Sequence, residues 1–168
     1  MSNRSSFIRF IGFCFLSVWL SVGCTPKTVP PMPELGIQTE EYNTHLRLSA
    51  PNGWNSFSTQ DSIGLRFEVI GNESVAIDPR TGVFLYMLQD DQWIEVSNLT
   101  KYPGITESLI YQPAQGIESN KGSLGVRPVL TDYEQNITLR VVLIGYIVIN
   151  GDVTSEEVAG YMDLSLKP

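Results

Sequence analysis

Apolar and polar residues alternate along most of the chain after residue 42, with the period of two that is typical of β-strands. The clearest case is IGLRFEVI at 63–70, where Arg66 and Glu68 lie between regularly spaced apolar residues. This alternation predicts a strand with one buried face and one solvated face, as in an antiparallel sheet. Strand patterns of the same kind occur at 45–50, 83–89, 92–96, 105–111, 124–130, 137–149 and 158–166.

The segment ITLRVVLIGYIVI at 137–149 is the longest and most apolar of these, which predicts a central strand. Gly145 within it is a predicted bulge. Asn150-Gly151 follows directly and favours a tight hairpin turn to a returning strand. Pro128 predicts that its own strand lies at a sheet edge or contains a bulge, because proline has no N–H to donate.

Turn-rich pieces separate these strands, and no segment keeps a helical periodicity. We therefore predict one all-β domain over residues 42–168, folded as a β-sandwich. The order of the strands, which ends in a long strand and its returning partner, resembles an immunoglobulin or fibronectin type III domain. The resemblance implies an immunoglobulin-like antiparallel sandwich of about seven or eight strands, although the Cys…Trp…Cys set of antibody domains is missing from the sequence.

The N-terminus carries an apolar run from Phe10 to Val22, which is 13 residues long and follows Arg4 and Arg9. A helix that crosses a bilayer needs about 20 apolar residues, so this run is too short for a span. A basic start, a short apolar middle and small residues before a cleavage point are the layout of a secretory signal peptide. We predict a signal peptide over residues 1–23.

Ser21-Val22-Gly23-Cys24 at the end of this run resembles the lipobox of bacterial lipoproteins, although Ser21 stands where that family prefers leucine. The resemblance implies a diacylglycerol on the sulfur of Cys24, cleavage before that residue and acylation of the new N-terminus. Two or three acyl chains such as palmitate hold a protein firmly on a membrane, whereas one chain binds marginally. The expected location is the extracytoplasmic side of the cell membrane or outer membrane. An ordinary cleaved signal and an uncleaved anchor are the alternatives.

Residues 24–41 form the predicted lipidated cysteine and a disordered, proline-rich tether. Four prolines and few large apolar groups lie between residues 25 and 41. At about 3.1 Å per residue, such a segment spans roughly 50 Å when extended. Pro30-Pro31-Met32-Pro33 also fits the spacing of a proline-rich ligand motif, but a tether needs the same composition.

The chain is acidic, with a net charge of −7, and the predicted cleavage removes Arg4 and Arg9 but no acidic residue. The mature charge is then −9, from 9 basic and 18 acidic residues, which argues against nucleic acid as a partner. Cys14 leaves with the signal peptide and Cys24 is the predicted anchor. The folded part therefore contains no thiol, and its stability depends on an apolar core.

The sequence offers few groups for catalysis or metal binding. His45 is the only histidine, so the sequence offers too few parts for a His–Cys metal site or a Ser-His-Asp triad, and we predict a solvated side chain for it. Most acidic residues lie in turns, such as Asp90-Asp91 and Glu156-Glu157, and a weak calcium site among them stays open. We predict no catalytic residue, no metal site and no cofactor, and hence a protein that is not an enzyme.

One predicted hairpin has two different faces. A two- or four-residue turn after Gln89 would place Leu88 opposite Trp93, and one face would then be wholly aliphatic. The other face would carry the aromatic residues Phe84, Tyr86 and Trp93. Two interpretations stay open: a loop at 112–123 covers these rings as a second small core, or they form an exposed recognition surface. We expect Trp54, by contrast, to fill one end of the sandwich.

Three functional hypotheses follow. The leading one is a non-catalytic, membrane-anchored envelope lipoprotein whose β-sandwich serves adhesion, scaffolding or protein–protein interaction. The alternative is a carbohydrate- or small-ligand-binding module that uses an exposed aromatic face formed by Phe84, Tyr86 and Trp93. An enzyme with a carboxylate pair is the third hypothesis, and no spacing of the acidic residues singles out such a pair. The expected partners are a membrane, through Cys24, and a protein or a glycan.

Overall fold

The computed structural model describes residues 42–53, 56–58, 62–100, 107–113, 120–130 and 134–168. The predicted signal peptide and tether, Cys24 and Trp54 lie outside these ranges, so their assigned roles stay predictions. Within the ranges, no helix has the length and apolar character that crossing a bilayer requires.

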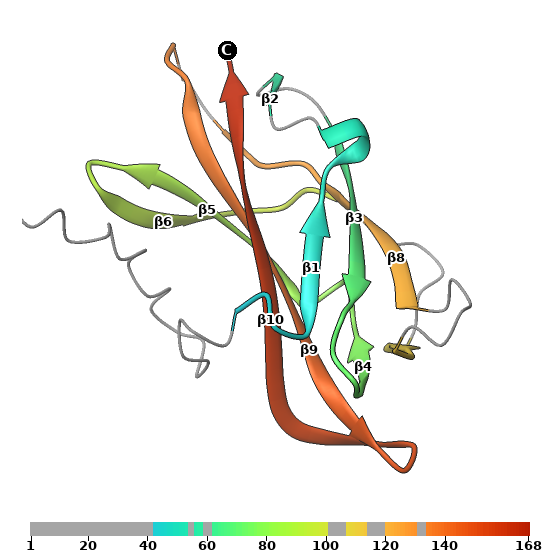
Figure 1. Cartoon of the computed structure of the whole chain (residues 1–168). Helices are drawn as coiled ribbons and strands as arrows, with labels where there is room; N and C mark the ends of the chain where they lie inside the picture. The colour runs from blue at the N-terminus through green and yellow to red at the C-terminus, as the bar shows by residue number, and fades with distance from the viewer. Residues whose placement is uncertain (1–41, 54–55, 59–61, 101–106, 114–119, 131–133) are drawn as a thin grey trace, which may run out of the picture.

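The described residues form an all-β fold with two packed sheets, as the alternating pattern predicted (Figure 1). Within the described ranges there are ten strands where about seven or eight were expected, because β2 and β4 are too short to show an alternation. The elements are β1 (Leu46–Ser49), the 3-10 turn η2 (Pro51–Gly53), β2 (Ser56–Ser58), β3 (Ile63–Val69), β4 (Ser74–Ile77), β5 (Val83–Gln89), β6 (Gln92–Val96), β7 (Leu109–Tyr111), β8 (Lys121–Val126), β9 (Ile137–Ile149) and β10 (Asp152–Lys167).

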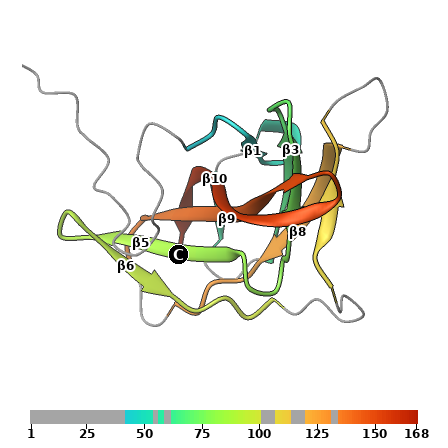
Figure 2. The same cartoon turned by 90° about the horizontal axis from the view of Figure 1, so that it is seen from below.

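The small sheet has the antiparallel order β1-β3-β8. The large sheet is built on β9, which pairs with β10 on one side and with both β5 and β4 on the other. β6 extends this sheet beyond β5 and β7 extends it beyond β4, while the short β2 runs parallel to the end of β10. Seen from below, the β5–β6 hairpin extends away from the small sheet (Figure 2).

The main core lies between the two sheets. Every second residue of β3, from Ile63 to Val69, points into it and is almost fully buried, which confirms the predicted alternation. The central position of β9 is confirmed as well, because this strand is buried on both faces along most of its length. Its odd-numbered residues, such as Leu139 and Val141, face the small sheet and belong to the main core.

The prediction of a bulge at Gly145 is wrong. Gly145 pairs regularly with Val158, and the irregularity lies in β10, between Val153 and Glu157. Glycine is needed at position 145 for a different reason: a Cβ there would clash with Cγ1 of Val75 on the neighbouring β4. β1 approaches β10 with similar closeness, since a Cβ at residue 160 would lie 2.6 Å from the carbonyl oxygen of Leu46.

The turns that set the strand register agree with the sequence. Asn150-Gly151 forms the predicted two-residue turn, with φ of 54° and 91°. Asp90 and Asp91 form a second such turn, with φ of 49° and 61°, which is the left-handed conformation that tight hairpins require. Pro128 lies beyond the end of β8, an edge strand of the small sheet, as its missing N–H predicted.

A five-residue turn, Asp78–Gly82, connects β4 to β5, and both strands pair with the same edge of β9. The carbonyl oxygen of Asp78 accepts a 2.7 Å hydrogen bond from the N–H of Gly82, and the carbonyl oxygen of Gly82 accepts one from Ile144. The Asp78 carboxylate accepts hydrogen bonds from the backbone N–H and Nε of Arg80, at 2.9 and 2.8 Å. These side-chain bonds to Arg80 hold the pKa of Asp78 below its usual value.

The lowered pKa predicts how this turn responds to pH. The ionised carboxylate stabilises the fold at neutral pH, and this contribution is lost as the pH falls through the folded-state pKa, which lies below the usual value of about 3.9. Asp78→Asn keeps an oxygen acceptor but removes the charge, and we expect it to cost about 0.5–1 kcal/mol at neutral pH. Urea unfolding of both forms should show this difference shrinking in acid; a difference that is equally large at all pH values would contradict the account.

Candidate functional site

The face of the large sheet that points away from the small sheet, here called the outer face, carries the aromatic residues noted in the sequence. The register of the β5–β6 hairpin is the predicted one, with Leu88 opposite Trp93 and Tyr86 opposite Glu95. Phe84, Tyr86 and Trp93 are therefore brought together on this face. With neighbouring strands they form the outer-face cluster, which consists of Tyr42, Phe84, Tyr86, Trp93, Arg140, Val142, Ile144, Ala159, Tyr161 and Asp163.

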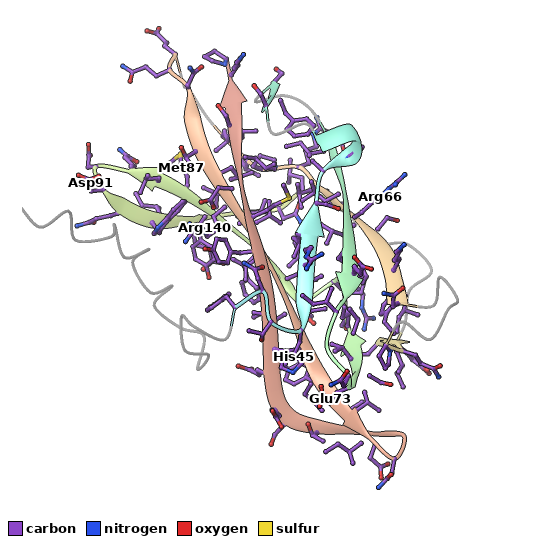
Figure 3. All side chains as sticks on the ribbon, in the orientation of Figure 1. His45, Arg66, Glu73, Met87, Asp91 and Arg140 are labelled. Carbon is purple, nitrogen blue, oxygen red and sulfur yellow. The ribbon has the colours of Figure 1, made fainter. Side chains whose placement is uncertain are left out.

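A buried arginine lies at the centre of the outer-face cluster. Arg140 is only 2% exposed, and its Nε and Nη2 donate 2.7 Å hydrogen bonds to the two carboxylate oxygens of Asp163 on the adjacent strand. Its Cζ lies 4.2 Å from the ring centroid of Trp93 and 4.3 Å from that of Tyr161. The guanidinium thus combines a bidentate ion pair with two cation–π contacts. Figure 3 shows Arg140 beside β10, near the base of the β5–β6 hairpin.

The irregularity in β10 makes this ion pair possible. A regular hairpin continued from the Asn150-Gly151 turn would pair Arg140 with Tyr161. Between Val153 and Glu157 the register shifts, so that Asp163 becomes the partner directly opposite Arg140. Sequence reasoning missed this pair, although the signal was present: Arg140 is the one charged residue in an otherwise apolar strand, and a buried arginine needs a carboxylate.

The aromatic residues form a second small core, which is one of the two arrangements that the sequence left open. Tyr86 is 5% exposed, and Phe84 and Trp93 are half-buried. Residues 114–119 of the expected cover at 112–123 lie outside the described residues, and Lys121–Ser123 belongs to β8 in the small sheet. The described residue that covers the cluster from outside the strands is Tyr42.

Tyr42 and Asn43, the first two described residues, are attached to this face. The N–H of Asn43 donates to the carbonyl oxygen of Ala159 at 2.9 Å, and its Oδ1 accepts from the N–H of Tyr161 at 2.8 Å. The rings of Tyr42 and Tyr161 meet edge to face, with centroids 5.7 Å apart. Burial raises the pKa of the Tyr42 hydroxyl, opposed by the nearby charge of Arg140.

Two buried hydrogen-bond donors of the outer-face cluster lack a partner in the described part of the chain. They are Nε1 of Trp93 and Nη1 of Arg140. A buried donor without an acceptor costs about 1–3 kcal/mol, so native structures rarely leave one.

Further along the outer face lies a second, more open surface. Ile110 and Tyr146 flank the buried Ala76 across three paired strands, and they are 50% and 40% exposed. Val153, which is 53% exposed, pairs with Val148 at the nearby end of the β9–β10 hairpin. We call Ile110, Tyr146 and Val153 the hairpin patch. It presents apolar side chains to solvent next to the outer-face cluster.

The predicted solvated histidine is half-buried, with Nε2 of His45 3.5 Å from a carboxylate oxygen of Glu73. Among the described residues, no group of three His, Cys, Asp or Glu side chains is placed to hold a metal ion. No protein-family model, curated protein or solved structure matches this chain. Its candidate sites are therefore defined by their own geometry, as the outer-face cluster and the hairpin patch.

The ion pair predicts an asymmetric response to substitution. Asp163→Asn leaves the Arg140 charge buried without a counter-ion, and we expect it to destabilise the fold by about 1–3 kcal/mol. Arg140→Met should cost less, because the carboxylate of Asp163 is 40% exposed and stays solvated. The double variant should recover part of the loss in urea unfolding. The control is Asp152→Asn, at an exposed position beside the hairpin turn. If Asp163→Asn lowers the free energy of unfolding no more than this control does, the ion pair does not support the fold.

Proposed function

We propose that this protein is a non-catalytic envelope lipoprotein, anchored through Cys24, whose β-sandwich binds another protein through the hairpin patch. The observation that carries the proposal is the exposure of Ile110, Tyr146 and Val153 on one face of the large sheet. Exposed apolar side chains that include an aromatic ring and share one face are typical of contact surfaces. The lipobox-like sequence supports a membrane-attached setting in which such a surface faces the extracytoplasmic space.

The strand order supports an immunoglobulin-like sandwich as the scaffold for this contact. In such domains, strands A, B and E pair in one sheet and strands C, F and G in the other. β1, β3 and β8 here have the order A-B-E, and β10, β9 and β5 have the order G-F-C. Sandwiches of this type commonly serve as cell-surface contact domains, which agrees with an envelope location.

The geometry favours a protein contact over the alternative of a carbohydrate-binding module. Sugar stacking needs a free aromatic face, and the Arg140 guanidinium already occupies one of the two faces of the Trp93 ring, which leaves less of this ring for a sugar. Tyr86 is buried, so it offers no surface to a sugar. Tyr146 in the hairpin patch is more exposed than Tyr86, and its hydroxyl lies 3.4 Å from a carboxylate oxygen of Glu157.

Photo-cross-linking in intact cells tests this proposal. A photoreactive side chain at Tyr146 should give a discrete adduct with one protein, and Ile110→Lys should abolish that adduct by placing a charge in the hairpin patch. The same group at Leu99, which is 56% exposed elsewhere, is the matched control and should give no adduct. The Cys24→Ser form should leave the membrane fraction. Equal labelling from both positions, or no adduct at either, would contradict the proposed contact.

A further inference from the structure

We propose that the partner of the hairpin patch is a second copy of this chain, which docks through the outward face of its small sheet. The inference rests on the proposed function, because it names the partner of the same surface. It is drawn from two exposed regions of opposite charge, one on each outer side of the sandwich.

The segments that carry the hairpin patch contain acidic side chains and no lysine or arginine. Residues 71–77, 107–113 and 146–157 meet there, and their acidic residues are Glu73, Glu107, Asp152, Glu156 and Glu157. All of these are exposed except Glu157, which is half-buried directly opposite Tyr146. Apolar side chains bordered by carboxylates fit a partner with long basic side chains, whose stems pack on the apolar surface while their charges reach the carboxylates.

The outward face of the small sheet has the opposite charge. Each of its strands contributes one exposed basic side chain, namely Arg47 from β1, Arg66 from β3 and Lys121 from β8. Arg47 and Lys121 lie in one row on either side of Glu68, and Arg66 lies in the next row between two serines. We call this surface the basic face. It carries a net positive charge in a chain whose net charge is −7.

The cations of the basic face are available to another molecule. Within the described ranges none of the three forms an ion pair, whereas Arg80 is paired with Asp78 and Arg140 is buried. Glu68, the acidic residue of this face, accepts a 3.2 Å hydrogen bond from Nδ2 of Asn120. Figure 3 shows the arginine of β3 on the opposite side of the molecule from the β5–β6 hairpin.

Tyr146 and Glu157 together provide what an arginine side chain binds. A guanidinium is attracted to the face of an exposed aromatic ring and forms charge-assisted hydrogen bonds to a carboxylate. The hydroxyl of Tyr146 lies 3.4 Å from a carboxylate oxygen of Glu157, so one guanidinium can contact both groups. We assign this contact to Arg66, because no carboxylate stands directly opposite it in its own sheet. Ile110 and Val153 then pack against the methylene groups of the basic side chains.

The charge of the whole chain does not prevent this contact. Two acidic copies repel each other at long range, but exposed charges more than about 8 Å apart are largely screened at physiological ionic strength. The groups that meet at the contact therefore decide its free energy, and these have opposite signs. The predicted anchor at Cys24 also raises the local concentration of the copies by holding them on one membrane.

The position of the two surfaces predicts the form of the assembly. The hairpin patch lies on the outer face of the large sheet and the basic face lies on the small sheet, so the two copies dock head to tail. Each docked copy leaves its own hairpin patch open to a further copy. A contact of this kind builds a row of molecules unless the rotation between copies closes a ring.

Photo-cross-linking between two differently tagged copies of the full chain tests the inference in intact cells. The probe copy carries a photoreactive side chain at Tyr146, and we expect an adduct that has the mass of two chains and contains both tags. Arg66→Glu in the acceptor copy should reduce this adduct by about tenfold or more, because it brings a carboxylate to Glu157. Arg66→Glu in the probe copy should leave it unchanged, since the probe contributes only its hairpin patch.

Three controls make the result specific. Lys167→Glu in the acceptor copy reverses an exposed cation at the end of β10 and should not change the adduct. Glu157→Lys in the probe copy should restore the adduct with the Arg66→Glu acceptor, because the two charges are exchanged. Arg66→Gln removes the charge without reversing it and should give an intermediate loss, and equal amounts of each acceptor in the membrane fraction show that the variants fold.

The outcomes separate this inference from the proposed function. An adduct of Tyr146 with a different protein would overturn the inference but leave the contact at the hairpin patch in place. The same holds for a two-chain adduct that Arg66→Glu in the acceptor leaves unchanged, or that Lys167→Glu reduces equally. No adduct at Tyr146 would overturn both.

Discussion

The burial of the Arg140 guanidinium is the constraint on which the outer face depends. An ionised side chain inside a sheet costs several kcal/mol unless it is paired and hydrogen-bonded. The Asp163 carboxylate accepts two 2.7 Å hydrogen bonds from the Arg140 guanidinium. The rings of Trp93 and Tyr161 make cation–π contacts with the same group. These contacts fix β6, β9 and β10 to one another. They also fix the register of the longest hairpin, because a shift of one pair would replace the carboxylate opposite Arg140.

The same constraint divides the outer face into two regions with different roles. Around Arg140, the aromatic side chains pack together, and two of them make cation–π contacts with the guanidinium. Tyr42, the first described residue, packs edge to face on Tyr161. Around Tyr146, the hydroxyl of this residue lies 3.4 Å from the carboxylate of Glu157, and Ile110 and Val153 stay exposed. We place the proposed protein contact on this second region. An aromatic face identified from alternation alone is thus separated into a packed part and an open part by one arginine.

The sequence predicted those elements whose register depends on local patterns. Alternation was sufficient to predict β3 and its buried face. Two tight turns were sufficient to predict how the β5–β6 hairpin pairs and where β10 starts to pair with β9. Other features depend on contacts that no local pattern contains. The bulge in β10 replaces Tyr161 by Asp163 opposite Arg140, and Gly145 is required by the close approach of Val75. The cover of the aromatic residues comes from Tyr42, which alternation does not place on either face.

The most direct test of this account is hydrogen exchange at Nε of Arg140, followed by 15N NMR in the native protein. If the guanidinium is buried and paired with Asp163, this proton should be as well protected as the core amides of β9, since it would exchange only on global unfolding. An Arg140 Nε–H that exchanges as fast as that of a solvent-exposed arginine would show that the outer face is not organised around this charge.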